Sequence, residues 1–268
     1  MNIRKNKKSY WIFGKHPVIS AILNPHRKVL RIIISKNKEK IYAKTLKDKL
    51  FISKKNINVE ILPTNHFNKI INHGVNQGIG ILVEPLELIN INSFYNQVSN
   101  KKTNISVLLS DINDPHNVGA IIRSAVAFDI KNIFLKKNRS PQDTQTIAKV
   151  ASGGLDKVNI YNFGNAGITF KMLKKKGWYI MGLELNTKYT LNTIKKDKFN
   201  FDKILIIMGS ESSGISPFIK KNCDILIKIP INSNNINSLN VSCAAAITFY
   251  QINSLINDDS SNTISRSR

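Results

Sequence analysis

The chain is predicted to be an α/β protein with two domains, and three observations lead to this prediction. Apolar runs alternate with longer amphipathic segments, which is the pattern of strands followed by helices. A length of 268 residues suits two modest domains. Hydrophobic residues make up 42% of the chain, which is enough for real cores. Between residues 87 and 103 the pattern weakens into polar residues, which predicts a linker.

The first domain is predicted over residues 10–86, after a basic segment at residues 1–9. Its strands are short and rich in β-branched residues, and Pro63 suits the first turn of a helix because its ring fixes the backbone angle. The expected elements are, in order, a short strand from Tyr10, a helix at 16–23, a strand at 29–35, a Lys-rich helix at 38–50, a strand at 58–62, a helix opened by Pro63 and a strand at 78–85.

The second domain is predicted over residues 104–257, followed by a polar tail at 258–268 that we expect to fray. Strands that alternate with helices imply a parallel sheet, whose ligands bind at the carboxyl ends of the strands. The expected elements are a strand at 105–111, a helix at 117–128, a strand at 132–136, a helix at 143–150, a strand at 158–162, a helix ending at Lys176, strands at 178–184 and 203–209, a helical turn after Ser216, a strand at 225–230 and a helix from Leu239 to about Leu255.

The charge of the chain indicates a polyanionic partner. Lys and Arg number 40 against 17 Asp and Glu, which gives a net charge of +23. The basic residues are spread along the whole chain, and such a spread suits a nucleic acid held over a wide surface. The abundance of Lys, Asn and Ile also fits an AT-biased genome. Some of the lysines would then be solvated surface residues without a role in binding. The charge alone does not indicate a reaction.

Several classes of protein are excluded by composition. The apolar runs are far shorter than the ~20 residues of a membrane span. The basic first residues contain no apolar h-region, so we expect no secretory signal. Cys223 and Cys243 are the only cysteines, and they form neither a disulfide framework nor a CxxC zinc site. We therefore expect a cytoplasmic protein without a metal.

The first of three unusual loops covers residues 110–125. Asn117 stands where the helix should begin, and the simplest interpretation is that it caps this helix. Arg123 lies among small apolar residues, so it either reaches out to solvent or is held for a ligand. His116 is a lone histidine in a turn, which we interpret as structural.

The second loop follows the apolar run at 204–208. Gly209, Ser210 and Glu211 come directly after this expected strand. A glycine lets the backbone approach a ligand closely, and a carboxylate at a strand end can bind hydroxyls or orient a cation. The loop is neither a dinucleotide fingerprint nor a P-loop, because it lacks both glycine patterns.

The third loop lies within residues 227–250. A strand ends at residues 229–230, and a helix opens at Ser238, Leu239 and Asn240. Ser238 could simply cap that helix. The residues that follow are small (Ser-Cys-Ala-Ala-Ala), which would let another backbone pack close to the helix.

Together the three loops resemble the motifs of the SpoU (TrmH-type) RNA 2′-O-ribose methyltransferases, a branch of the SPOUT superclass. They are similar to N-x-G-A-x-x-R-S-A, to G-S-E-x-x-G-[IL]-S and to I-P-[MI]…S-L-N-V-S-x-A, in that order. The first domain resembles the substrate-binding domain of RlmB-type members, through GKHPVISAIL at 14–23 and HGVNQGIGILVEP at 73–85. Two features depart from the family: Ser212 replaces a usual glycine, and the Asn-rich stretch between Pro230 and Ser238 lacks one.

The resemblance implies a fold, a cofactor and an activity. The fold would be a small ribosomal-protein-like α/β domain followed by a SPOUT parallel sheet with a C-terminal trefoil knot. S-adenosyl-L-methionine would be the methyl donor, held by Gly209, Ile229 and Leu239, mostly through backbone atoms. The activity would be 2′-O-methylation of a guanosine ribose in large-subunit (23S) ribosomal RNA by a homodimer joined through the C-terminal domain.

Two alternatives remain open at this point. One is a transfer RNA ribose methyltransferase, although the tRNA enzymes known as TrmH lack the folded first domain. The other is a noncatalytic RNA-binding or ribosome-assembly protein on the same scaffold. The presence of all five candidate catalytic residues, Asn117, Arg123, Glu211, Ser238 and Asn240, favours an enzyme.

The resemblance also implies a role for each candidate catalytic residue. Arg123 would activate the 2′-hydroxyl, yet a guanidinium stays charged because its pKa lies above ~12. It would therefore act either as a desolvated base helped by Asn117, or as a cation that positions a phosphate and stabilises a developing alkoxide. Glu211, Ser238 and Asn240 would orient the ribose and Arg123.

Overall fold

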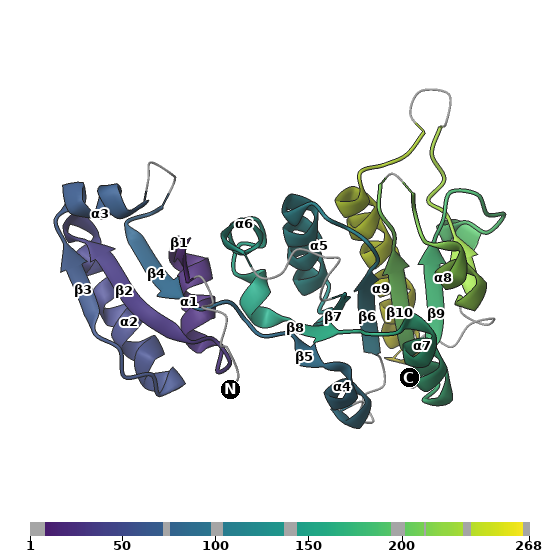
Figure 1. Ribbon diagram of the computed structural model, residues 1–268, viewed down its shortest axis with the longest axis horizontal. Coiled ribbons are helices and arrows are strands. Elements are labelled where there is room, and N and C mark those ends of the chain that lie inside the picture. Colours follow the sequence, from purple (N-terminus) through teal and green to yellow (C-terminus); the bar gives the residue numbers. More distant parts are fainter. Residues whose placement is uncertain are drawn as a thin grey trace, which may run out of the picture. The chain divides into compact units, whose positions relative to one another are not determined.

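The structure is a computed structural model of the chain, shown as a ribbon in Figure 1. It describes residues 9–71, 76–97, 104–136, 144–193, 202–211, 213–232 and 237–264. The chain forms two compact units. The first unit comprises Met1–Glu87 together with Asp143–Lys157, and the second comprises Leu88–Gln142 together with Val158–Arg268.

The first unit contains a four-stranded mixed sheet in the order β1-β4-β2-β3. Only β2 and β3 pair in parallel, because β4 lies between β1 and β2 and runs antiparallel to both. An alternation of strands and helices therefore did not make this sheet parallel. The elements are β1 (Tyr10–Phe13), α1 (Lys15–Leu23), β2 (Val29–Ser35), the 3-10 helix η1 (Lys36–Lys38), α2 (Glu39–Ser53), β3 (Val59–Leu62), α3 (Thr64–Ile71) and β4 (Ile79–Val83).

A segment from later in the chain completes the first unit. Helix α6 (Gln145–Val150) contacts β1, and the 3-10 helix η2 (Gly154–Lys157) contacts α1. Arg27 fixes this segment through two bonds to Asp156, from Nε to Oδ1 at 2.7 Å and from Nη2 to Oδ2 at 3.2 Å. Residues 144–157 were predicted to belong to the second domain, and the structure places them in the first unit.

The second unit contains a seven-stranded sheet in the order β11-β9-β10-β6-β7-β8-β5, and every strand pair in it is parallel. The parallel α/β fold predicted for this domain is confirmed; the trefoil knot stays a prediction. The elements are β5 (Ile89–Asn90), α4 (Ile91–Gln97), β6 (Asn104–Leu109), α5 (Pro115–Ala127), β7 (Asn132–Leu135), β8 (Asn159–Asn162), α7 (Ala166–Lys175), β9 (Tyr179–Leu183), the 3-10 helix η3 (Leu191–Thr193), β10 (Lys203–Met208), α8 (Pro217–Asn222), β11 (Ile225–Ile227) and α9 (Val241–Ile264).

Helices cover both faces of this sheet, as parallel sheets require. On one face α4, α7 and α8 form a common core with the strands, which includes Phe94, Phe134, Phe170 and Trp178. Helices α5 and α9 pack against each other and bury a set of small and branched residues: Val118, Ile121, Ile122, Ala125, Val241, Ala245, Phe249 and Ile252. Because strand side chains alternate between the faces, this second set lies opposite the first core.

Two local predictions differ from the structure, and a third falls outside the described residues. Part of the expected linker forms β5 and α4, and β5 pairs with β8 at the edge of the larger sheet. Composition missed these elements because they are short and polar. Helix α9 continues to Ile264 and so includes most of the expected tail, since a helix that has already formed gains one hydrogen bond for each residue added. Residues 1–8 of the basic segment lie outside the described ranges.

Candidate active site

The three unusual loops follow strands of the parallel sheet or begin the helices behind it. The first follows β6, the second follows β10 and the third joins β11 to α9. Because parallel strands end at the same edge of a sheet, the carboxyl ends of β6, β10 and β11 gather these loops. All three loops therefore lie at one edge of the sheet in the second unit, which is the edge where we expect a ligand to bind.

Three candidate residues meet around one carboxylate oxygen. Oε1 of Glu211 accepts hydrogen bonds from Nδ2 of Asn117 at 3.0 Å and from Nδ2 of Asn240 at 2.7 Å. The backbone N–H of Val241 donates to the same oxygen at 3.3 Å. Asn240 also donates to Oδ1 of Asn117 at 3.0 Å. The structure thus joins Asn117, Glu211 and Asn240, which we call the amide–carboxylate cluster.

Local chemistry explains why these side chains are held there. Asn240 caps α9: its Oδ1 accepts hydrogen bonds from the backbone N–H of Ser242 and Cys243 and from the Ser242 hydroxyl. The partial positive charge at the start of α9 also favours the Glu211 carboxylate beside Val241. The cluster lies at the surface, since Glu211 and Asn240 are exposed and Asn117 is half-buried. Its polar atoms can therefore reach a ligand.

The simple capping roles considered for Asn117 and Ser238 are wrong. Asp114 caps α5, because its side chain accepts a bond from the His116 N–H, and Pro115 occupies the first helical position. Asn117 lies one turn further on and is free to point at Glu211. Ser238 lies two residues before the cap of α9, which is Asn240.

A tight turn carries Glu211 away from β10. Ser210 and Gly214 exchange two backbone hydrogen bonds, of 3.2 and 2.9 Å. A Cβ at Gly209 would lie 2.2 Å from the carbonyl carbon of Gly214, so only glycine fits at this position. Gly214 has φ +63, a left-handed conformation that also favours glycine. Ser212, the departure from the family pattern, lies outside the described residues.

The other two catalytic candidates are not part of the cluster. Arg123 is exposed, and within the described part of the chain it forms no hydrogen bond or ion pair. It lies six residues after Asn117 on α5, which separates the two by about 9 Å along the axis and turns Arg123 to another face. Ser238 is also exposed, beside the stretch 233–236 that is outside the described ranges.

The three residues expected to hold the cofactor lie at the same edge of the sheet. Among the described residues, no side-chain contact links them to one another. Gly209 closes the turn after β10, Ile229 follows β11, and Leu239 precedes the cap of α9; all three are half-buried. Their placement agrees with a backbone role and does not by itself establish one.

Glu184 is a candidate that the sequence analysis missed. It comes directly after β9, its side chain is 10% exposed, and its Oε2 lies 2.5 Å from Nζ of Lys220 on α8. This oxygen forms an ion pair but no hydrogen bond in the described structure, and it faces Gly214. The pattern that identified Glu211, a carboxylate just after a buried strand, would also have identified Glu184.

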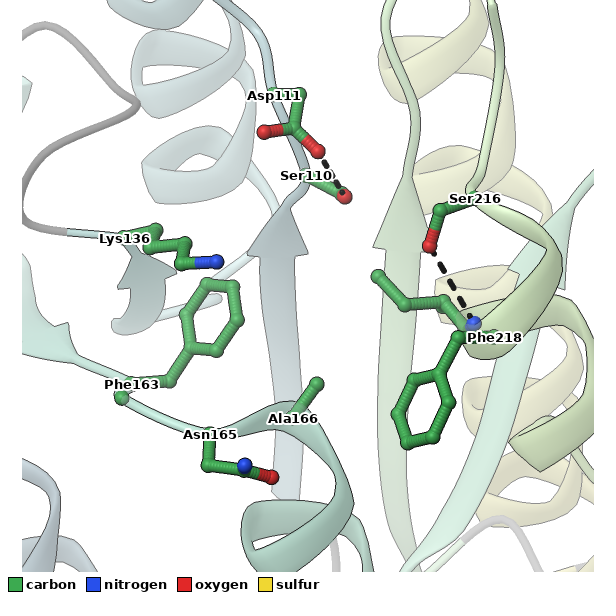
Figure 2. Close-up of a pocket in the computed structure, with 10 residues that line it drawn as sticks. Ser110, Asp111, Lys136, Phe163, Asn165, Ala166, Ser216 and Phe218 are labelled. Carbon is green, nitrogen blue, oxygen red and sulfur yellow. Dashed lines mark hydrogen bonds between the residues drawn. The ribbon is translucent and has the colours of Figure 1, made fainter.

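A cleft of about 400 Å³ opens at the same edge of the sheet, at the ends of β6, β7 and β8. Figure 2 shows Lys136 and Phe163 on one side of it and Ser216 and Phe218 on the other. Ser110 and Asp111, which begin the first loop, also line it. Its remaining lining residues are Gly164, Asn165, Ala166 and Ile219.

The described ranges contain neither a candidate metal site nor a candidate membrane-spanning helix. No group of three or more His, Cys, Asp or Glu there is placed to hold a metal ion. No helix in those ranges is both long and apolar enough to cross a membrane.

A doubly covered parallel sheet with a polar site at its carboxyl edge is typical of α/β proteins that bind ligands there. Comparison with known proteins gives the family. The profile of the SpoU rRNA Methylase family matches residues 104–250. A second profile, RNA 2′-O ribose methyltransferase substrate binding, matches residues 11–89. The chain belongs to the SpoU (TrmH) family of RNA 2′-O-ribose methyltransferases.

Relatives and solved structures agree with this family. A Staphylococcus aureus (strain COL) protein assigned to the TrmH family of tRNA/rRNA methyltransferases is 31% identical over 246 residues, which are 90% of this chain and 94% of the relative. A Staphylococcus epidermidis relative with the same assignment is 32% identical over 244 residues, with the same coverage of both chains.

Two solved structures show the fold. The AdoMet-bound rRNA methyltransferase from Sinorhizobium meliloti superposes with a TM-score of 0.74 at 18% identity, covering 93% of this chain and 88% of that one. The SpoU methyltransferase AviRb from Streptomyces viridochromogenes, in complex with AdoMet, gives 0.70 at 16% identity, covering 91% and 89%.

Proposed function

We propose that this RNA 2′-O-ribose methyltransferase modifies a guanosine of large-subunit (23S) ribosomal RNA, in the cytoplasm, with S-adenosyl-L-methionine as methyl donor. The observation that carries the catalytic part is the amide–carboxylate cluster, which unites three loops of the sequence around Glu211 Oε1. The observation that favours ribosomal RNA is the folded first unit, whose sequence matches a substrate-binding profile. The transfer RNA alternative would use the same cluster.

The residues at the carboxyl edge fit this cofactor. Gly209 lies against the backbone of Gly214, which keeps the turn after β10 compact, and a Cβ at Gly214 would meet only Glu184 Oε2, at 3.7 Å, so the backbone of Gly214 is open to a ligand. Oε2 of Glu184 pairs with Lys220 and accepts no hydrogen bond within the described residues, and the ribose of an adenosine group supplies two hydroxyl donors. When bound, S-adenosyl-L-methionine supplies a methyl group activated by the positive charge of its sulfonium. Gly209, Ile229, Leu239 and Glu184 are the residues that would hold it.

The protein's own contribution is to position the hydroxyl and to stabilise its charge. Asn117 and Asn240 hold Glu211 in one orientation; Asn240 uses both of its amide hydrogens in the cluster, whereas Asn117 retains one N–H that can meet a ribose hydroxyl. The positively charged guanidinium of Arg123 stabilises the alkoxide that develops as the 2′-hydroxyl loses its proton to solvent water. Ser238 is close enough in the chain to Asn240 to bind the same ribose.

Arg123 lies on another face of α5 than Asn117. In a homodimer it could act on the ribose bound at the partner's site. Exposed side chains follow one face of α9, at Cys243, Ile247 and Tyr250, and the last two are 41% and 60% exposed. Their spacing is that of one helical stripe. We propose that a homodimer buries this stripe and brings Arg123 to the partner's site, since two-fold dimers are the commonest assembly.

One experiment tests the substrate directly. Ribose methylation is mapped along ribosomal RNA and transfer RNA from cells with and without the gene. Loss of a single 2′-O-methylguanosine in the large-subunit RNA supports the proposal. Loss of a transfer RNA methyl group instead would establish the alternative substrate, and no loss in either RNA would favour a noncatalytic RNA-binding protein.

Sedimentation of the purified chain tests the dimer, which a fully active monomer at micromolar concentration would contradict.

A further inference from the structure

The cleft between Lys136 and Phe218 is lined by none of the residues to which the proposed reaction is assigned. It lies at the ends of β6, β7 and β8, whereas the amide–carboxylate cluster belongs to the loops after β6 and β10 and to the start of α9. Its volume of about 400 Å³ falls within the range of small-ligand sites, about 300–1,000 Å³. A single nucleotide base with its sugar is a ligand of this size.

One wall of the cleft offers an aromatic surface. Phe218 is 55% exposed, and its ring packs over the first turn of α7, where a Cβ at Gly167 would lie 3.1 Å from its Cζ. Phe163, in contrast, is 3% exposed and belongs to the core. The faces of nucleobases stack on exposed aromatic rings.

The cleft offers hydrogen-bond donors from Lys136, Asn165 and Ser216, and one carboxylate, Asp111, which accepts from the Ser110 hydroxyl. Figure 2 shows the Lys136 amine directed into the space between the two walls. Within the described residues this amine has no hydrogen-bond or ion-pair partner. Asn165 and Ser216 use their oxygens to cap α7 and α8, which leaves the amide and hydroxyl hydrogens to donate. Donors of this kind match the acceptor atoms of bases and phosphates.

We infer that this cleft binds one unpaired nucleotide of the RNA substrate, with its base on Phe218 and an acceptor group on Lys136. The inference rests on the proposed function, because it takes RNA as the substrate. The net charge of +23 favours a polyanion at an unpaired lysine. The nucleotide must be unpaired, since bases inside an RNA helix cannot stack on a protein side chain. The site extends the grip on RNA beyond the methylated ribose.

Fluorescence titration of the full-length protein tests this inference. The probe is a single-stranded oligoadenylate RNA containing 2-aminopurine, whose emission falls when the base stacks. Phe218→Ala should weaken RNA binding about 5- to 100-fold and remove the stacking signal. Lys136→Ala should also weaken binding and should reduce the slope of log affinity against log salt by about 1.

Two matched variants control for general effects. Lys131→Ala removes an exposed lysine just before β7, at the opposite end of the strand that Lys136 follows. Ile168→Ala truncates an apolar residue on α7 that is 66% exposed. Both should bind RNA like the wild type. If Lys131→Ala weakens binding as much as Lys136→Ala, the effect is unspecific charge and the inference is overturned.

Calorimetry with S-adenosylhomocysteine separates this site from the cofactor site and confirms folding. Phe218→Ala and Lys136→Ala should both bind S-adenosylhomocysteine with unchanged affinity. If both variants lose the binding of S-adenosylhomocysteine as well as of RNA, the cleft belongs to the cofactor site. Wild-type protein that stacks the probe but methylates no RNA would refute the proposed function and leave the cleft standing. Wild-type methylation with unaltered RNA binding by Phe218→Ala would refute the cleft alone.

Discussion

Two clusters of polar side chains, one in each unit, are built in opposite ways. In the first unit the side chains of Arg27 and Asp156 are 0% and 2% exposed, and each charge is met by the other. In the second unit Glu211 is exposed and is met by two neutral amides, from Asn117 and Asn240. One cluster cannot touch a ligand, whereas the other can.

This difference separates stability from function. A buried ion pair is costly to break, because either partner left alone keeps an uncompensated charge away from water. An exposed cluster costs little to alter, because water replaces the lost hydrogen bonds. Changes in the buried cluster should therefore move the unfolding midpoint, and changes at the exposed edge should move the rate of methyl transfer.

The largest effect is expected at Arg123. Arg123→Ala should fold and bind cofactor, yet methyl transfer should fall about 10²- to 10⁴-fold, the range of a lost acid–base group. Arg123→Lys keeps the charge but loses the planar fork, so it retains activity only if the role is electrostatic. Single-turnover rates across pH, with RNA binding measured separately, distinguish the two roles. A rate for Arg123→Ala within a few-fold of wild type would contradict the assignment.

Asp156→Ala should give the next largest effect, on stability. Removal of one partner of a buried ion pair costs about 3–5 kcal/mol of unfolding free energy. The remaining Arg27 would keep Tyr10 and the Glu84 carbonyl as partners but lose both carboxylate bonds. Chemical denaturation measures the loss. The exposed pair Lys131 and Asp129 serves as control, since Asp129→Ala should change stability little.

The buried pair of Arg27 and Asp156 also determines how a truncation of the first unit should behave. Deletion of residues 1–87 would leave α6 and η2 without the elements they pack against, because Asp156 would lose Arg27. We expect such a truncation to be less stable than the full chain and to bind RNA more weakly. Thermal unfolding measures the first effect. RNA capture equal to that of the full chain would contradict a substrate-binding role for this unit.

Glu211→Gln should give a smaller effect, confined to activity. The amide keeps one acceptor oxygen for Asn117 and Asn240 but loses the charge that strengthens their bonds, a difference of about 1 kcal/mol for each bond. Methyl transfer should fall roughly 30-fold, since the two bonds together lose about 2 kcal/mol and 1.4 kcal/mol is a factor of ten. The unfolding midpoint should stay unchanged. A large drop in that midpoint would mean that the exposed cluster is structural after all.

The smallest effect concerns the thiols. Burial raises the pKa of Cys223 to about 12, so it remains a protonated thiol with very low reactivity throughout the neutral range. Cys243 is exposed on the stripe of α9. In an Ile247→Glu variant, designed to open the proposed dimer, iodoacetamide at pH 8 should label Cys243 and leave Cys223 unmodified. Mass spectrometry of the digested protein reads out both sites, and rapid labelling of Cys223 would contradict its burial.

The sequence by itself determined the order of most elements, with β5 and α4 as the exceptions, and the identity of the loops. Both are local properties: apolar periodicity distinguishes strands from helices, and glycine, proline and capping residues mark their ends. The β6, β10 and β11 strands and the Asn117, Glu211 and Asn240 positions were all identified in this way. The motif resemblance then indicated the family, which the comparisons confirm.

Only the tertiary structure decided which residues meet. Asp114 and Asn117 are both good capping residues, and local chemistry could not show that Asp114 caps α5 while Asn117 turns to Glu211, 94 positions away. The contact between Asn117 and Asn240 spans 123 positions. Residues 144–157 likewise read as part of the second domain until Arg27 paired with Asp156. Such contacts depend on how whole elements pack, and no local pattern encodes that packing.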